Sequence, residues 1–255
     1  MAAADTGAGR GSWALSLLAL LALWAAAALL AGQPQLLPSP ARVAVVAWHD
    51  LVAGDMLADL AATLLRVAAA FVLSMLAGTV LGWLAGRSAR ANALLDPWLV
   101  VALNLPVLVV VMLAYVWIGL NETAAVVAVA IAKTPTVVVT VREGARALET
   151  GFEELSQAFR VPRLRHLRHV VLPQLAPYLA AAGRGGLSIT WKIVLIVELL
   201  GRPNGVGFAL NLRFQNFDVA GMLAYGLVFA AIMLAIEYAL LQPWERRTHA
   251  WRDAA

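Results

Sequence analysis

Six long apolar stretches dominate the sequence and restrict what it can fold into. A helix needs about 20 mostly apolar residues to cross the hydrocarbon core of a bilayer. The stretches that reach or nearly reach this length are 13–31, 61–85, 94–118, 123–141, 174–199 and 219–241. We therefore predict an all-α integral membrane protein with about six transmembrane helices.

The overall composition supports this interpretation. Apolar residues make up 62% of the 255 positions and charged residues 13%, whereas a soluble domain is about half apolar and about a quarter charged. The pI near 10.0 is compatible with a nucleic-acid-binding protein, but the basic residues lie between the apolar stretches. We therefore expect them to be loop charges and expect no nucleic-acid partner. The absence of cysteine excludes disulfides and thiolate metal sites, and no His, Asp and Glu residues have the spacing of metal ligands.

The apolar stretches divide the chain into regions. We expect an N-terminal region with the first helix, an external loop, a membrane core with a polar loop, and a cytoplasmic tail, at 1–35, 36–60, 61–241 (loop 142–173) and 242–255. The first stretch ends near Ala31-Gly32, which also resembles a signal-peptide cleavage site. Its apolar run is longer than the roughly 7–15 residues of a signal peptide, which favours an uncleaved helix.

The basic residues are distributed unevenly between the two sides of the predicted membrane domain. Loops that face the cytoplasm carry an excess of Lys and Arg. If the N-terminus is inside, the outer segments hold only Arg42, Arg202 and Arg213. The inner segments then hold Arg10, Arg87, Arg90, Arg142, Arg146, Arg160, Arg163, Arg165, Arg168, Arg246, Arg247 and Arg252. This bias predicts that both termini are cytoplasmic.

The polar loop at 142–173 contains two short amphipathic patterns. Leu155, Ala158 and Phe159 are spaced as one face of a helix, and Val161-Pro162 interrupts the pattern before a second, arginine-rich helical stretch. Such a loop could lie against anionic lipid headgroups, or it could be a docking surface for a cytoplasmic partner. The residues alone leave both alternatives open.

Several short motifs, in order, resemble a known family of transport proteins. Glu154, followed eighteen residues later by Leu172-Pro173, is similar to the coupling-loop signature of permease subunits in ATP-binding-cassette importers. Further matches to the nitrate/sulfonate/taurine group of these permeases are Leu37-Pro38-Ser39-Pro40, Arg66-Val67, Asp96-Pro97, Pro135, Glu198-Leu199-Leu200-Gly201, Gly205-Val206-Gly207, Glu245-Arg246-Arg247 and Trp251. The resemblance covers residues 36 to 252.

The loop departs from the family pattern at two places. Leu155 and Ser156 replace a pair of alanines, and Arg160 stands where the family has glycine. Glycine adopts backbone angles that a side chain disfavours. We therefore expect the turn here to be formed differently, by Val161-Pro162.

The resemblance implies a type I ABC importer permease fold and a set of partners. These are two copies of an ATP-binding subunit that holds ATP and Mg, a second permease copy (a homodimer, or a heterodimer with a paralogue), an external solute-binding protein and lipid of the bacterial cytoplasmic (inner) membrane. The residues that the resemblance assigns to the ATPase-coupling loop are Glu153, Glu154, Ser156, Ala158, Arg160, Val161, Pro162, Arg163, Arg165, Leu172 and Pro173. The chain has no Gly-x-x-x-x-Gly-Lys-Ser/Thr loop for nucleotide phosphates and no Gly-x-Ser-x-Gly motif, so we expect no catalytic residues and no cofactor in it.

Polar residues inside the fifth apolar stretch fall on one side of a helix. At about 100° per residue, an arc of roughly 120° contains Arg184, Ser188, Trp191, Lys192 and Glu198. Ionisable groups within spans usually face protein or a water-filled path, so these residues are candidates to line a translocation path; Asn104 and Lys133 are two further candidates. Alternatively, Arg184 and Lys192 are paired internally with a carboxylate such as Glu237.

Cations along a path would suit a small anionic solute such as a sulfonate, taurine or nitrate, and a pyrimidine-like or other non-anionic solute is the alternative. A secondary transporter driven by an ion gradient would use the same charges for ion coupling. However, no inverted repeat is evident, and the basic loop would then have no purpose. A membrane scaffold that transports nothing is a further alternative.

Overall fold

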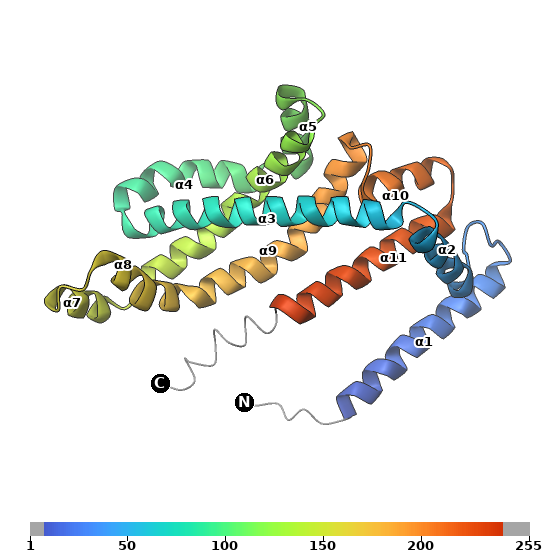
Figure 1. Cartoon of the computed structure of the whole chain (residues 1–255), viewed down its shortest axis with the longest axis horizontal. Coiled ribbons are helices and arrows are strands. Elements are labelled where there is room, and N and C mark those ends of the chain that lie inside the picture. Colours follow the sequence, from blue (N-terminus) through green and yellow to red (C-terminus); the bar gives the residue numbers. More distant parts are fainter. Residues whose placement is uncertain (1–7, 242–255) are drawn as a thin grey trace.

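The computed structural model describes residues 8–241, and within this range the chain forms helices and turns with no β-strand (Figure 1). Residues 1–7 and the expected cytoplasmic tail at 242–255 lie outside the described residues. The helices are α1 (Ala8–Ala31), α2 (Pro40–Val52), α3 (Met56–Arg87), α4 (Ala89–Asn104), α5 (Val107–Ile118), α6 (Glu122–Arg146), α7 (Thr150–Ala158), α8 (Arg163–His166), α9 (Leu172–Gly201), α10 (Val206–Gln215) and α11 (Val219–Ile236). Two π-helical segments follow directly on these helices: Leu167–Val171 after α8 and Glu237–Leu241 after α11. The predicted all-α fold is confirmed.

Four of the described helical segments are long and apolar enough to cross a membrane. They are Met56–Arg87, Glu122–Arg146, Arg163–Gly201 and Val219–Ala239. The apolar part of α1 within the described residues, Leu15–Ala31, is shorter. A fifth span results if α4 and α5 are counted together, so the described chain has four or five clear spans where six were predicted.

The third expected helix, 94–118, is broken in the middle. Its two halves, α4 and α5, meet at an angle of 101°. Leu105 has extended backbone angles (φ −72°, ψ 129°) and Pro106 precedes α5. A proline disfavours the helical conformation of the residue before it and has no N–H to continue the helix. The Leu105-Pro106 pair was therefore a readable signal for this break.

Glycines on α3 allow it to pack closely against α6. A Cβ on Gly78 would lie 2.5 Å from the Cβ of Val137, and one on Gly82 would lie 2.7 Å from the carbonyl oxygen of Val138. Small residues at such spacing bring membrane helices together, because van der Waals packing replaces the hydrophobic effect between them. A hydrophobic core that includes Val67, Val129 and Val194 then forms where α3, α6 and α9 meet.

Most of the long helices run roughly along the long axis of the molecule, whereas α5 stands across it (Figure 1). One end of the molecule, which we call the α7–α8 end, carries the loop predicted as a docking surface; the opposite α2–α10 end carries α2, α10 and the connection between α9 and α10. The expected loop at 36–60 contains α2, a 13-residue helix that begins after the N-cap Ser39. Apolar side chains on α1 and α5, such as Leu30 (88% exposed) and Trp117 (76%), face outward from the chain, as expected for surfaces in contact with lipid or another membrane subunit.

Candidate functional site

The turn between α7 and α8 is made at Arg160. Its φ of +49° is in the left-handed region, and the N–H of Val161 donates a 2.9 Å hydrogen bond to the carbonyl of Ser156. This six-residue closure is a Schellman motif, in which the left-handed position is usually glycine. The expectation that the turn is formed differently without glycine is therefore wrong. Arg160 adopts the backbone that glycine would adopt, and Pro162 follows it and precedes α8.

The α7–α8 segment exposes apolar side chains. Phe159 is 75% exposed, Leu164 77% and Leu155 55%. An isolated exposed leucine is ordinary, but a contiguous apolar patch marks an interaction site. The predicted amphipathic helices thus keep their apolar faces uncovered in the single chain.

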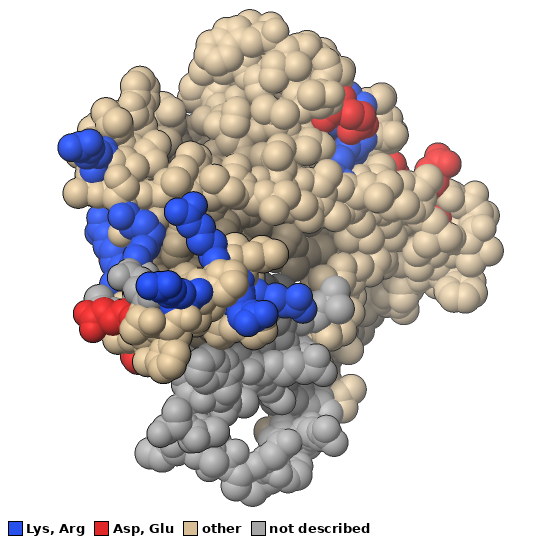
Figure 2. Space-filling view, turned by 60° about the vertical axis from the view of Figure 1, so that its left-hand side comes forward, with Lys and Arg blue, Asp and Glu red and all other residues tan. Residues whose placement is uncertain are grey.

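Basic side chains surround this patch. Figure 2 shows lysine and arginine gathered on this end of the molecule. Of the predicted coupling residues, Ser156 and Val161 are half-buried, and those exposed are Glu154, Ala158, Arg160, Pro162, Arg163 and Arg165. Glu153 lies on α7, and its side chain is outside the described part of the structure.

Leu172 and Pro173 lie within a continuous helical run from α8 into α9, Arg163–Gly201. The N–H of Leu172 donates to the carbonyl of Leu167, five residues earlier. Proline has no N–H, and a local π-turn is one way to accommodate the missing bond. A displacement of α8 can therefore be passed directly to α9.

A groove between α9 and α11 is lined by three of the residues predicted to line a translocation path. Ser188, Trp191 and Lys192 line a cavity of about 270 Å³ together with Glu237 of the π-helical segment after α11. The ammonium of Lys192 lies 5.4 Å from the centre of the Trp191 ring. Arg184 Nε lies 3.8 Å from Glu237 Oε1, so the internal pairing considered for Arg184 is present. The role of this groove in a path stays a prediction.

The last three of the seven candidates, Lys133, Asn104 and Glu198, lie elsewhere. Lys133 is buried (5% exposed) and donates to Thr136 Oγ1 at 2.8 Å. Gly186 of α9 lies against it, since a Cβ there would be 3.0 Å from Lys133 Cε. Asn104 ends α4 beside the bend and donates to the carbonyl of Val100. Glu198 is fully buried and lies outside the groove, because α10 and the chain leading to it cover this end of α9.

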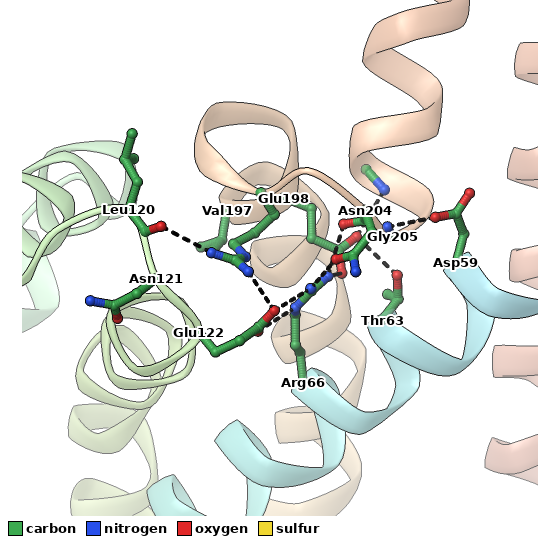
Figure 3. A network of polar contacts seen from close by, with 12 residues as sticks. Asp59, Thr63, Arg66, Leu120, Asn121, Glu122, Val197, Glu198, Asn204 and Gly205 are labelled. Carbon is green, nitrogen blue, oxygen red and sulfur yellow. Dashed lines mark hydrogen bonds and ion pairs between the residues drawn. The ribbon is translucent and has the colours of Figure 1, made fainter.

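Glu198 and Arg66 form the buried centre of a polar network that joins three spans, and Glu122 is its exposed member (Figure 3). The Glu198 carboxylate accepts hydrogen bonds from Thr63 Oγ1 (2.9 Å), Arg66 Nη1 (2.7 Å) and the N–H of Gly207 (2.8 Å). Arg66, on α3, also donates to both carboxylate oxygens of Glu122, at 2.8 and 2.7 Å. A bidentate pair of this kind fixes geometry as well as charge.

The connection between α9 and α10 closes the network. Arg66 donates to the backbone and side-chain oxygens of Asn204, and Arg202 donates to Glu122 at 2.6 Å. Gly205 has a φ of +106°, and a Cβ there would lie 2.5 Å from Glu198 Cδ. Only glycine fits at this point. At the α2–α10 end, the guanidinium of Arg66 thus holds the ends of α3, α6 and α9 together by hydrogen bonds.

The pairing of charges in this network was not predicted from the sequence. The available signal was that Arg66 and Glu198 both lie inside apolar stretches, where charged groups pair with one another. The distance of 132 positions between them in the chain hides which charge pairs with which.

Comparison with known proteins places the chain in a family. The family model for the binding-protein-dependent transport system inner membrane component matches residues 78–241. The chain belongs to this family. The match runs from the second half of α3 to the end of the π-helical segment after α11 and therefore includes the exposed α7–α8 segment.

Individual relatives agree with this membership. The taurine transport system permease protein TauC of Escherichia coli (strain K12) is 25% identical over 233 residues, covering 89% of this chain and 84% of that protein. The bicarbonate transport system permease protein CmpB of Synechococcus elongatus is 26% identical over 186 residues, covering 72% and 67%. A solved structure titled as an amino acid ABC transporter superimposes with a TM-score of 0.61 at 21% identity, covering 75% of this chain and 93% of that one. The permease fold predicted from the sequence is confirmed.

Proposed function

We propose that this permease subunit works in a bacterial cytoplasmic membrane as a homodimer that imports a small anionic solute with energy from a separate ATP-binding subunit. Two copies of that subunit, which hold ATP and Mg, dock on the α7–α8 segments, and an external solute-binding protein delivers the solute. The observation that carries the proposal is the exposed apolar patch of Leu155, Phe159 and Leu164, surrounded by exposed arginines at one end of the spans.

The distribution of charge supports the orientation. Arg87, Arg90, Arg163, Arg165 and Arg168 are exposed at or near the α7–α8 end. Because cytoplasmic loops are enriched in arginine, this end faces the cytoplasm and both termini lie inside. The ATP-binding subunit is then on the side where ATP is available.

The solute class follows from the relatives and from the groove. TauC and CmpB are named for taurine and bicarbonate transport, and both solutes carry an anionic group. In this chain the exposed ammonium of Lys192 lines the groove between α9 and α11. The groove is open at the surface of the single chain, so a second copy would be needed to enclose a path.

The transport cycle uses the continuity of α8 with α9. ATP binding moves the docked subunits, α8 moves with them, and the spans rock between inward-open and outward-open states. The solute biases this equilibrium only through different affinities for the two states.

Charge reversal in the coupling segment tests the proposal. In Arg163→Glu/Arg165→Glu, we expect less ATP-binding subunit to be recovered with the membrane fraction, and uptake of taurine or bicarbonate should fall in parallel. The matched control is Arg87→Glu/Arg90→Glu, which makes the same change of charge at exposed positions at the end of α3 and the start of α4, outside the segment. The control should recover the wild-type amount of partner.

Two results would contradict the proposal. Equal recovery of the ATP-binding subunit with both double variants would remove α7–α8 as its docking site. Labelling of the segment from outside intact cells would place it where no ATP-driven subunit can reach it. If the transporter takes up a pyrimidine and no anion, the importer role stands and the proposed anionic solute is wrong.

A further inference from the structure

The helix α2 exposes an apolar stripe along one side. At about 100° per residue, Val45, Trp48 and Val52 fall within an arc of roughly 60°, and their exposed fractions are 68%, 70% and 69%. Ala41 and Ala44, which are also exposed, lie on the same side of the helix. The outward face of a surface helix in water is normally polar. The surroundings of this stripe therefore need an explanation other than water.

The opposite side of α2 is packed against the protein. Val43 is buried (4% exposed) and belongs to a hydrophobic cluster that includes Phe229 of α11. Asp50, also buried, accepts a hydrogen bond from Arg213 of α10. These contacts fix the orientation of α2, so the stripe is the face that folding of the single chain leaves uncovered.

The start of α2 lies alongside α1 and not beyond its end. The indole N–H of Trp24 donates a 3.1 Å hydrogen bond to the carbonyl of Pro38, which is two residues before the start of α2 at Pro40. Trp24 is seven residues before the end of α1 at Ala31, a distance of about 10 Å along the helix. Figure 1 shows α2 beside this part of α1. The first turn of α2 is therefore at the level of the last turns of α1.

α2 is too short to cross a bilayer. Its 13 residues extend over about 20 Å, whereas the hydrocarbon core is about 30 Å thick. A short helix with an apolar face at the level of span ends has the properties of a helix that lies in the membrane interface.

Two basic side chains follow one edge of the stripe. Arg42 and His49 are exposed, and they fall at roughly 100–120° from Trp48, on the side of Val45. An interfacial helix places such residues against lipid phosphates while its apolar face enters the acyl chains. Tryptophan is enriched at the same level of the bilayer. The arrangement of charge on α2 thus complements a lipid surface.

The neighbouring helices in the chain expose apolar side chains as well. Leu29, near the end of α1, is 80% exposed, and Leu57, at the start of α3, is 60% exposed. α3 belongs to the segments that are long and apolar enough to cross a membrane. The stripe on α2 therefore lies between two helices whose own surfaces suit lipid.

We infer that α2 is an interfacial helix, whose apolar stripe enters the acyl chains of the leaflet at the α2–α10 end while Arg42 and His49 lie at the lipid phosphates. A protein partner fits less well, because a stable interface takes about 20–30 residues on each side and the stripe offers five. This inference goes beyond the proposed function and depends on neither the solute nor the ATP-binding subunit. In the proposed orientation, the leaflet is the outer one.

Spin labels on single cysteines test the inference. The chain has no cysteine, so one label can be attached to the full-length chain in nanodiscs of phosphatidylcholine and phosphatidylglycerol. Labels at Val45→Cys and Val52→Cys should collide with oxygen more than with a water-soluble nickel chelate, and their depth should be about 5–10 Å below the phosphates. A label at His49→Cys should lie at the phosphates. The matched control is Gln35→Cys, at an exposed position before α2, which should be accessible to nickel as in water.

A second measurement needs no label. Val45→Asp places a carboxylate in the stripe and should lower Tm in nanodiscs by about 2–4 °C, whereas Gln35→Asp should leave Tm unchanged. Equal Tm values for wild type and both variants would count against contact with the acyl chains.

Two outcomes of the labelling would overturn the inference. If the labels at positions 45 and 52 are as accessible to nickel as the one at position 35, α2 lies in water. If they are shielded from both oxygen and nickel, a protein surface such as a second copy covers the stripe. Either result leaves the proposed importer intact. Conversely, loss of the ATP-binding partner or of solute uptake would not alter the depth of these labels.

Discussion

Removal of the Glu198 carboxylate should destabilise the membrane domain strongly. Glu198→Ala deletes three hydrogen bonds, of 2.7, 2.8 and 2.9 Å, and leaves the N–H of Gly207 without its carboxylate partner. Breaking a buried ion pair costs about 3–5 kcal/mol of the free energy of unfolding. We expect a loss in this range, because Arg66 retains Glu122 while the Gly207 amide has no other hydrogen-bond partner in the described structure. Glu198→Gln keeps an acceptor and should lose less, about 1–3 kcal/mol.

The assay is thermal unfolding of the purified subunit in a mild detergent. If each kcal/mol moves Tm by about 2–4 °C, Glu198→Ala should lower Tm by roughly 6–20 °C. The control Glu237→Ala removes a carboxylate that lies 3.8 Å from Arg184 and is partly exposed. It should cost less than about 1 kcal/mol. A loss for Glu198→Ala no larger than that of Glu237→Ala would refute the structural role of the network.

Three further perturbations probe other parts of the molecule. Arg160→Gly should leave the α7–α8 turn intact and Arg160→Val should destabilise it by about 1–2 kcal/mol, measured as faster chymotrypsin cleavage after Phe159; equal cleavage of the two variants would contradict the left-handed turn. Gly78→Ala should cost about 1–3 kcal/mol by overpacking, measured as a lower Tm, whereas Gly185→Ala, where a Cβ meets nothing within 4 Å, should be neutral. Burial disfavours the charged form of Asp218, but hydrogen bonds from the Gly221 N–H and from Arg213 outweigh it and hold its pKa below the ordinary value; this stabilisation is present above the unfolded pKa and disappears as the pH falls through the folded pKa. Asp218→Asn should therefore unfold more easily than wild type at pH 7, and the two should converge in acid, below about pH 4; a constant difference at all pH values would contradict this.

The two short helices of the α7–α8 segment could be predicted from the sequence. The pattern of Leu155, Ala158 and Phe159 followed by Val161-Pro162 specifies a short amphipathic helix and its end, because both depend on neighbours in the chain. The backbone at Arg160 could not be predicted correctly from its residue type. Arginine disfavours the left-handed conformation, but the hydrogen bond from the Val161 N–H to the Ser156 carbonyl holds it there.

The membrane spans likewise have features that the sequence predicts and features that only the structure shows. Apolar length located α3, α6, α9 and α11, whereas the break at Leu105-Pro106 was missed because hydropathy is continuous across it. On α9, helical periodicity placed Ser188, Trp191 and Lys192 together correctly. It could not show that Glu198 is buried apart from them, since periodicity gives a direction around the helix and takes no account of what covers it.

By itself, the sequence determined that this chain must lie in a membrane, where its helices run and which end is basic, because these properties follow from local apolar length and charge. Only the tertiary structure decided which charges within the spans and at their ends pair. Arg66, Glu122 and Glu198 lie far apart in the chain, and their meeting depends on how closely α3, α6 and α9 pack. The open cavity between α2, α3, α10 and α11 likewise arises from the assembly of four helices, which no single segment specifies.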